Sequence, residues 1–206
     1  MMNKFEEGLS KYLNKDQLKV IQSQKIGIGG AGGLGSNVAM ILVRTGFKNF
    51  EIIDQDVIEP SNLNRQQFFL NEIGQDKAFT LTRRLRKINP DANIISRKIQ
   101  WTETNANEFF SDCAMIIEAF DQVDWKYRFI QHYQNTLKPV ISGNGMAGLF
   151  EKKPMTVRKL GNIYFVGDNS TDTDSGHPPL APRVTACAAK MAEIALDLTL
   201  GIFPGP

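Results

Sequence analysis

The chain has 206 residues, of which 42% are hydrophobic and 22% charged, and its formal net charge at pH 7 is +2. This composition predicts a single globular domain over residues 1–206 and gives no argument for a nucleic-acid partner. No apolar run reaches the length of a membrane span, and two cysteines with a mixed, charged opening segment favour a cytoplasmic protein with free thiols.

The first quarter of the chain predicts helices followed by a strand, a helix and a second strand. Residues 1–24 carry apolar side chains at helical spacing among charges, which predicts an N-terminal helical segment. Apolar runs then predict a strand at 25–29, a helix at 37–45 and a strand at 50–54.

Three glycines follow the first predicted strand in the order G-x-G-x-x-G, at Gly30, Gly32 and Gly35. In a nucleotide-binding turn they would allow tight bending, close approach of a phosphate, and packing of helix on strand. Asp54 ends the next strand, where a carboxylate can accept hydrogen bonds from ribose hydroxyls. The unit therefore predicts a nucleotide site in preference to a purely structural glycine turn.

A polar segment, QDVIEPSNLNRQQFF, follows Asp54 and is not required by an ordinary dinucleotide-binding fold. It brings together several side chains able to contact a nucleotide: Asp56, Asn62, Asn64, Arg65 and Gln66. The alternative is a solvated loop with a few turn-forming residues.

The remaining elements predict an α/β fold. In chain order we expect a helix at 72–88 with Lys77 near its start and Ile73 on its buried face, a strand at 93–99, a short helix at 103–110, a strand at 114–120, a helix to 136, a strand at 138–142, a hairpin within 156–168, a mobile crossover loop at 169–182 and a helix at 183–200. This order predicts a Rossmann-like, doubly wound, mainly parallel sheet flanked by helices, with a C-terminal β-hairpin and helix.

The run AMIIEAF at 114–120 is nearly all apolar, as expected of a central parallel strand covered on both faces. It leads directly to Asp121. Because ligands bind beyond the carboxyl ends of strands in open α/β sheets, Asp121 is a candidate functional residue. A role as the N-cap of the following helix is compatible with this.

With GGAGGLGS, IDQDVIEPSNLNRQ, Lys77 and Asp121 in this order, the chain resembles the ThiF/MoeB adenylyltransferases, relatives of the ubiquitin-activating enzymes. The resemblance runs from about residue 24 to residue 200 and is most specific in the motif D-x-D-x-x-x-x-S-N-L-N-R-Q. The compact length and the segment PPLAPR look most like the short ThiF-type subgroup.

The resemblance implies ATP-dependent adenylylation of the C-terminal glycine of a small ubiquitin-like sulfur carrier ending in Gly-Gly, with release of pyrophosphate, in thiamine biosynthesis. It implies that Arg65, Lys77 and Asp121 are catalytic and that Asp121 holds Mg²⁺. The implied nucleotide-binding residues are Gly30, Gly32, Gly35, Asp54, Asp56, Asn62, Asn64, Arg65, Gln66 and Lys77. It also implies a homodimer and a possible sulfur-donor protein.

The chain departs from this family pattern in three ways. It has no C-x-x-C pair, so we expect no structural zinc, and no cysteine in the predicted crossover loop. Cys187 has small neighbours and is expected to be a buried structural residue. Relatives often supply an N-terminal arginine to the neighbouring subunit; the first arginine here is Arg44, so that role falls to a lysine (Lys4, Lys11 or Lys15) or is missing.

Two other functions compete with adenylylation. An NAD-dependent oxidoreductase would need the glycine turn and Asp54, but it would not need the SNLNRQ segment, Lys77 and Asp121. A non-catalytic scaffold could keep the fold and bind a carrier, and the intact Arg65, Lys77 and Asp121 argue against it.

Overall fold

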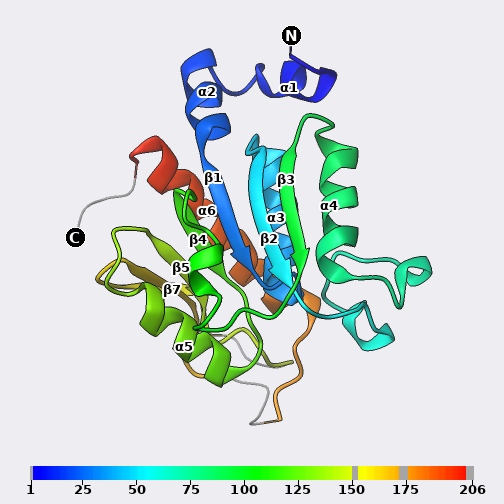
Figure 1. Cartoon of the computed structure of the whole chain (residues 1–206), viewed down its shortest axis with the longest axis vertical. Coiled ribbons are helices and arrows are strands. Elements are labelled where there is room, and N and C mark those ends of the chain that lie inside the picture. Colours follow the sequence, from blue (N-terminus) through cyan, green and yellow to red (C-terminus); the bar gives the residue numbers. More distant parts are fainter. Residues whose placement is uncertain (1, 150–152, 172–175, 203–206) are drawn as a thin grey trace.

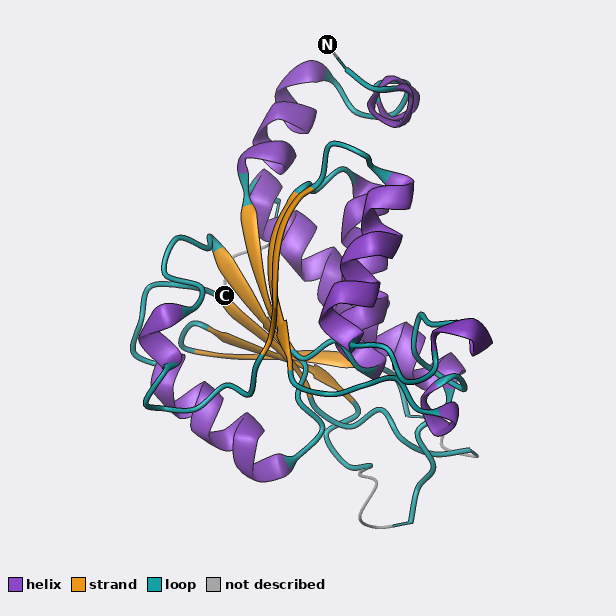
Figure 2. Ribbon diagram, turned by 45° about the vertical axis from the view of Figure 1, so that its right-hand side comes forward, coloured by secondary structure: helices purple, strands orange, loops and turns teal. Residues whose placement is uncertain are grey.

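A computed structural model describes residues 2–149, 153–171 and 176–202, which form a seven-stranded sheet with helices on both faces (Figures 1 and 2). The strands are β1 (Lys25–Gly29), β2 (Asn49–Asp54), β3 (Asn93–Lys98), β4 (Met115–Glu118), β5 (Val140–Gly143), β6 (Thr156–Leu160) and β7 (Ile163–Gly167). Their spatial order is β3-β2-β1-β4-β5-β7-β6, and all neighbours are parallel except β6 and β7, which form an antiparallel pair. The predicted fold class, including the C-terminal hairpin, is confirmed.

The described part of the chain has six α-helices, four of which cover the faces of the sheet. They are α1 (Lys4–Leu9), α2 (Lys15–Ser23), α3 (Gly33–Thr45), α4 (Lys77–Ile88), α5 (Val123–Tyr133) and α6 (Ala181–Leu200), with short 3₁₀ helices η1 (Pro60–Asn62), η2 (Leu70–Glu72) and η3 (Ala106–Glu108). Helices α3, α4 and α6 share one hydrophobic core, and α5 lies on the opposite side of the sheet (Figure 2). This is the doubly wound arrangement expected of a mainly parallel sheet.

Strand β1 lies at the centre of the sheet, between β2 and β4. Ile28 of β1 pairs in register with Ile52 of β2 and Ile117 of β4, and all three side chains are fully buried. Because chain order reverses between β1 and β4, the loops that follow these strands diverge and leave a crevice at their carboxyl ends. The sequence pattern therefore places the glycine turn at this crevice.

The predicted N-terminal helical segment forms two capped helices. Asn3 accepts a hydrogen bond from the Glu6 backbone N–H at the start of α1, and Asn14 and Gln17 form a reciprocal capping box at the start of α2. In Figure 1 both helices lie above the amino ends of the strands, at the end of the sheet away from the strand arrowheads.

Several predicted helix boundaries were wrong. The helix expected at 72–88 begins only at Lys77, because Gly74 has φ 84 and interrupts the helix, and Ile73 is 38% exposed. The helix expected at 103–110 is reduced to η3, and Phe110 has φ 59 while its side chain is fully buried. Burial of the apolar side chain therefore overrides local helix propensity there.

The C-terminal helix also begins earlier than predicted, at residue 181 instead of residue 183. Pro182 lies in its first turn, where the missing N–H costs no helical hydrogen bond. Residues 172–175 of the predicted mobile crossover loop lie outside the described residues.

Candidate active site

The glycine turn is closely packed between β1 and α3. Gly30 has φ 96, and a Cβ there would lie 2.7 Å from the carbonyl oxygen of Ala119. At Gly35 a Cβ would overlap the carbonyl oxygen of Gly30. Glycine is therefore required at both positions, one for the turn and one for contact between helix and strand.

A cavity of about 330 Å³ opens at the carboxyl ends of the strands, next to this turn. Eight residues predicted from the sequence line it: Gly30, Gly32, Asp54, Asp56, Arg65, Gln66, Lys77 and Asp121. Three other predicted residues are not among the lining residues: Gly35, Asn62 and Asn64. The volume is at the lower end of the range that accommodates small-molecule ligands.

Asp54 closes the turn from β2. Its Oδ2 accepts a hydrogen bond of 2.6 Å from the Ala31 backbone N–H, and its Oδ1 accepts one of 2.7 Å from Asp56 N–H. Burial raises the pKa of Asp54, while these two backbone hydrogen bonds oppose the shift. The carboxylate is thus fixed at the wall of the cavity by backbone donors.

Lys77 is the first residue of α4, and its side chain is only 7% exposed. Its Nζ donates a hydrogen bond of 2.8 Å to Oδ2 of Asp56. Both residues line the cavity, so an anionic ligand would compete with Asp56 for the Lys77 ammonium group.

Arg65 is positioned by its neighbours and by α3. Its Nη1 donates to the Ser61 carbonyl oxygen and to Oδ1 of Asn64, and its own carbonyl oxygen accepts from Nδ2 of Asn37. Asn64 in turn donates from Nδ2 to the carbonyl oxygen of Pro179, near the start of α6. Asn64 therefore orients Arg65 and ties this segment to the chain leading into α6.

Two amides of the same segment have different roles. Asn62 accepts a hydrogen bond from the Glu59 backbone N–H and stabilises η1. Gln66 is 8% exposed and lines the cavity, and its Oε1 has no hydrogen-bond partner among the described residues. A buried acceptor at a cavity wall is suited to a ligand that donates a hydrogen bond.

Asp121 follows β4 and is exposed to the cavity, as expected from its place at a strand end. A carboxylate facing a site with bound phosphates is the type of ligand that Mg²⁺ prefers. The Asp121 carboxylate is therefore of the kind that would hold a magnesium ion at this cavity.

Sequence reasoning missed Lys126, a cavity-lining residue of α5. Its Nζ lies 2.5 Å from Oε2 of Glu118, whose side chain has no exposed surface and also accepts hydrogen bonds from Ser142 Oγ and the Phe120 N–H. A glutamate within the apolar run AMIIEAF was the available signal, since a buried carboxylate requires such partners. Other lining residues missed were Gln100, Trp101, Trp125, Asn144 and Thr171.

The two cysteines and the N-terminal lysines are not among the residues that line the cavity. Burial raises the pKa of Cys113 and of Cys187 to about 12 in each case, and both side chains are buried. Lys4, Lys11 and Lys15 are exposed. They belong to the segment of α1 and α2, which lies beyond the amino ends of the strands (Figure 1), whereas the cavity lies at the carboxyl ends.

A protein-family model described as the ThiF family matches residues 7–199. The tRNA threonylcarbamoyladenosine dehydratase of Bacillus subtilis is 29% identical over 137 residues, which are 66% of this chain and 54% of that protein. The adenylyltransferase and sulfurtransferase UBA4 of Eremothecium gossypii is 31% identical over 191 residues, 89% of this chain and 43% of that protein. The sulfur carrier protein ThiS adenylyltransferase of B. subtilis is 35% identical over 109 residues, 52% of this chain and 32% of that protein.

Solved structures share the fold over nearly the whole chain. The Escherichia coli dehydratase TcdA in complex with AMP superposes with a TM-score of 0.84 at 23% identity, covering 95% of this chain and 93% of that one. Its complex with ATP gives a TM-score of 0.83 at 22% identity, with the same coverage. In contrast, the chain spans about half or less of the length of these curated relatives. Within the described residues, no helix has both the length and the apolar character needed to cross a membrane.

Proposed function

Since the chain belongs to the ThiF family, we propose that it is an ATP-dependent adenylyltransferase that activates the C-terminal glycine carboxylate of a small ubiquitin-like sulfur carrier. The observation that carries this proposal is the convergence of Asp54, Lys77 and Asp121 with the glycine turn at one cavity. They supply a ribose acceptor, a phosphate cation and a metal-binding carboxylate, respectively.

The chemistry follows from the charges around the cavity. A carrier carboxylate oxygen attacks the α-phosphorus of ATP, the bond to the bridging oxygen breaks, and pyrophosphate leaves. Arg65 and Lys77 stabilise the negative charge that develops on the phosphate oxygens, and the glycine turn places backbone N–H groups beside them. Magnesium held by Asp121 would neutralise further phosphate charge.

This mechanism requires no covalent protein intermediate. Catalysis consists of positioning two anions and stabilising the charge that develops as they react. Asp54 fixes the ribose, and Asn64 orients Arg65 through its side-chain oxygen. Because both cysteines are buried with raised pKa values, neither provides a thiolate for thioester formation.

We place the chain in thiamine biosynthesis, with a ThiS-like carrier and a separate sulfur-donor protein. The PPLAPR segment supports this placement, as does the similarity to a ThiS adenylyltransferase. A second candidate is activation of the carboxylate of threonylcarbamoyladenosine in tRNA. Similarity to a tRNA threonylcarbamoyladenosine dehydratase favours it, and both reactions would begin by adenylating a carboxylate.

Two measurements test these assignments. Calorimetric titration should detect binding of ATP with Mg²⁺ and no binding of NAD; tight NAD binding without ATP binding would contradict adenylylation and favour an oxidoreductase. ATP–pyrophosphate exchange should then occur with carriers ending in Gly-Gly and not with threonylcarbamoyladenosine-modified tRNA. Exchange with the tRNA alone would select the second candidate, and nucleotide binding without exchange would indicate a scaffold.

We also propose a homodimer in which the N-terminal segment of one subunit approaches the active site of the other. The exposed Lys4, Lys11 and Lys15 lie at the end of the sheet opposite their own cavity, so a role in catalysis would be at a neighbour's cavity.

A further inference from the structure

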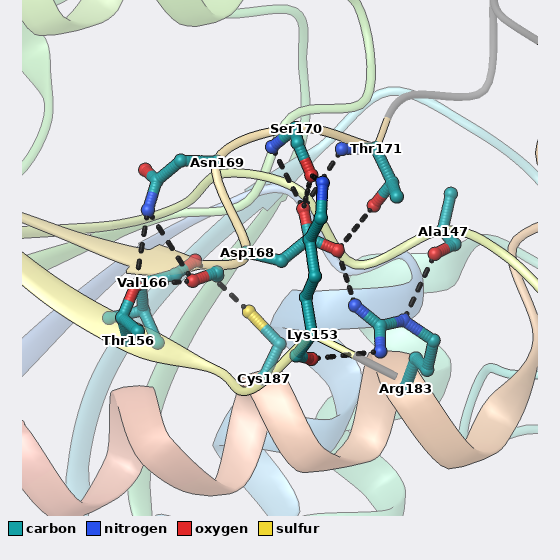
Figure 3. A network of polar contacts seen from close by, with 11 residues as sticks. Ala147, Lys153, Thr156, Val166, Asp168, Asn169, Ser170, Thr171, Arg183 and Cys187 are labelled. Atoms are coloured by element: carbon teal, nitrogen blue, oxygen red, sulfur yellow. Dashed lines mark hydrogen bonds and ion pairs between the residues drawn. The ribbon is translucent and has the colours of Figure 1, made fainter. Parts of the chain in front are cut away.

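Asp168 forms the centre of a polar network at the end of β7 (Figure 3). Its side chain has no exposed surface. Oδ1 accepts hydrogen bonds of 2.9 Å from the backbone N–H groups of Ser170 and Thr171, and Oδ2 accepts one of 2.8 Å from Thr171 Oγ1. The Arg183 guanidinium pairs with the same Oδ2. The carboxylate is thus fully occupied by donors from two segments of the chain.

Arg183 extends this network from the first turn of α6 to the loop after β5. Its Nε donates a hydrogen bond of 3.0 Å to the carbonyl oxygen of Ala147, and its Nη1 donates one of 3.2 Å to that of Lys153 (Figure 3). One side chain therefore connects α6, the end of β7 and both ends of the segment 147–153. A planar guanidinium can make all of these bonds at once, whereas a lysine ammonium cannot reach them together.

The segments joined by this network form one wall of the cavity. Lining residues from them include Gly143, Gly145, Ala147 and Thr171. Gly145 has φ 83, and a Cβ at that position would overlap Oδ1 of Asp168. The glycine-rich loop therefore packs directly against the carboxylate, and its backbone position depends on where Asp168 is held.

The residues assigned to the nucleotide come from other elements. Asp54 ends β2 and Lys77 begins α4, and in the described part of the chain neither residue hydrogen bonds to Asp168 or Arg183. The wall at 143–147 carries no charged side chain, and three of its five residues are glycine or alanine. A substitution at Asp168 or Arg183 can therefore change the wall at 143–147 without changing the part of the cavity formed by Asp54 and Lys77.

We propose that the Asp168–Arg183 pair is a positioning element. It holds residues 143–147 and Thr171, which we call the acceptor wall of the cavity, in the position that places the attacking carboxylate. This inference rests on the proposed function for the identity of the acceptor. Asp168 and Arg183 act through the loop and not by contact with the reacting atoms.

The test compares Arg183→Ala, Arg183→Lys and a matched control, Lys190→Ala, which breaks an exposed ion pair with Glu193 on the same helix. In pyrophosphate exchange with the carrier that supports it in wild type, Arg183→Ala should raise the KM for carrier about tenfold or more. The affinity for ATP with Mg²⁺, measured by calorimetry, should change less than about twofold. Arg183→Lys should raise the KM for carrier less than Arg183→Ala does, and Lys190→Ala should match wild type.

Hydrogen–deuterium exchange gives a readout that does not need a carrier. Arg183→Ala should lose amide protection at residues 143–149, while peptides from β2 and α4 keep theirs. If Arg183→Ala does not fold, Thr171→Val removes one donor to Asp168 and should shift protection in the same direction.

Unchanged protection at 143–149, or an ATP affinity that falls as far as the carrier KM rises, would overturn the proposal. Absence of exchange with every carrier in wild type would count against the proposed function. In that case the hydrogen exchange and ATP titrations still decide whether the pair holds the wall independently of the nucleotide side.

Discussion

Arg65 and Lys77 are cations that line the cavity, and each is held by its neighbours in a different way. Arg65 is oriented by Asn64 and the Ser61 carbonyl, whereas Lys77 is paired with Asp56 at 2.8 Å. Under the proposed function, Lys77 would exchange its carboxylate partner for a phosphate when ATP binds.

Replacing Arg65 or Lys77 with alanine should lower kcat/KM for ATP–pyrophosphate exchange. Each change removes one electrostatic donor from the developing phosphate charge, which typically costs about 10²–10³ in rate, or ~2.7–4 kcal/mol. Lys87→Ala, an exposed lysine in the last turn of α4, is the control and should keep wild-type exchange. Wild-type rates in the Arg65 and Lys77 variants would refute their catalytic assignment.

The double variant Cys113→Ala, Cys187→Ala should keep pyrophosphate exchange with its carrier. Both thiols are buried with their pKa raised to about 12 by burial, so the thiolate required for a thioester is not populated at neutral pH. Thermal unfolding would report the stability lost when two buried side chains are shortened. A folded double variant that makes adenylate but no longer passes the carrier to its sulfur donor would establish a covalent role for cysteine.

At the scale of elements, the turn between β1 and α3 determines the shape of the nucleotide side. Helix α3 begins at Gly33, earlier than the sequence pattern suggested, with Gly32 as its N-cap. Ser36 and Asn37 on its first turns then hold the segment after η1, because Ser36 Oγ accepts from Gln67 N–H and Asn37 donates to the Arg65 carbonyl oxygen. One helix thus positions both the glycine turn and the Arg65 segment.

Gly35→Ala should therefore disrupt the turn as a unit. A Cβ at this position would overlap the Gly30 carbonyl oxygen, so α3 would have to move away from β1. We expect a loss of stability of about 1–3 kcal/mol, as for overpacking of a core, together with weakened ATP binding. The control is Gly8→Ala in α1, where no atom lies within 4 Å of the added Cβ and helix propensity favours alanine by about 1 kcal/mol. Urea unfolding measures the stability of both variants, and titration measures their affinity for ATP. If Gly35→Ala and Gly8→Ala changed these two quantities equally, steric overlap at Gly35 would be unimportant.

At the scale of the whole molecule, the Asp168 network joins the C-terminal helix to the sheet and makes stability depend on pH. Burial opposes ionisation of Asp168, but hydrogen bonds from the backbone and side chains of Thr171 and Ser170 outweigh it and lower its pKa from 3.8 to about 2. The contribution of the carboxylate to folding is fully present above about pH 4, where an unfolded aspartate is ionised, and is lost as pH falls through 2.

Asp168→Asn should be less stable than wild type at neutral pH, and the difference should shrink between about pH 4 and pH 2. Urea unfolding at a series of pH values measures both proteins in the same way. A stability difference that stays constant to pH 2 would mean that the charge of Asp168 does not stabilise the fold.

The proposed homodimer makes a separate prediction about assembly. Light scattering should give a dimer mass, and a charge-removing variant of Lys4, Lys11 and Lys15 should exchange pyrophosphate more slowly while keeping that mass. A fully active monomer at working concentrations would contradict the dimer.

Local sequence patterns were enough to predict the order of most elements and part of the cavity lining. Glycine spacing, the acid at the end of β2 and the motif around Arg65 are local patterns, and six of the residues they indicated line the cavity: Gly30, Gly32, Asp54, Asp56, Arg65 and Gln66. The apolar run that contains β4 likewise predicted a central parallel strand, because strands covered on both faces lose their alternation. Neighbouring residues specify turns and strands, so a local sequence pattern is enough to predict them.

The remaining side-chain pairings around the cavity depend on tertiary packing. Arg183 pairs with Asp168 and donates to the carbonyl oxygen of Ala147, which lies 36 residues away along the chain, and Lys126 of α5 pairs with Glu118 of β4. Sequence spacing cannot predict which buried carboxylate meets which cation, because that depends on how α5 and α6 pack against the sheet. The same reason explains the shortened segment at η3, where burial of Phe109 and Phe110 replaces a helix that local propensity favoured.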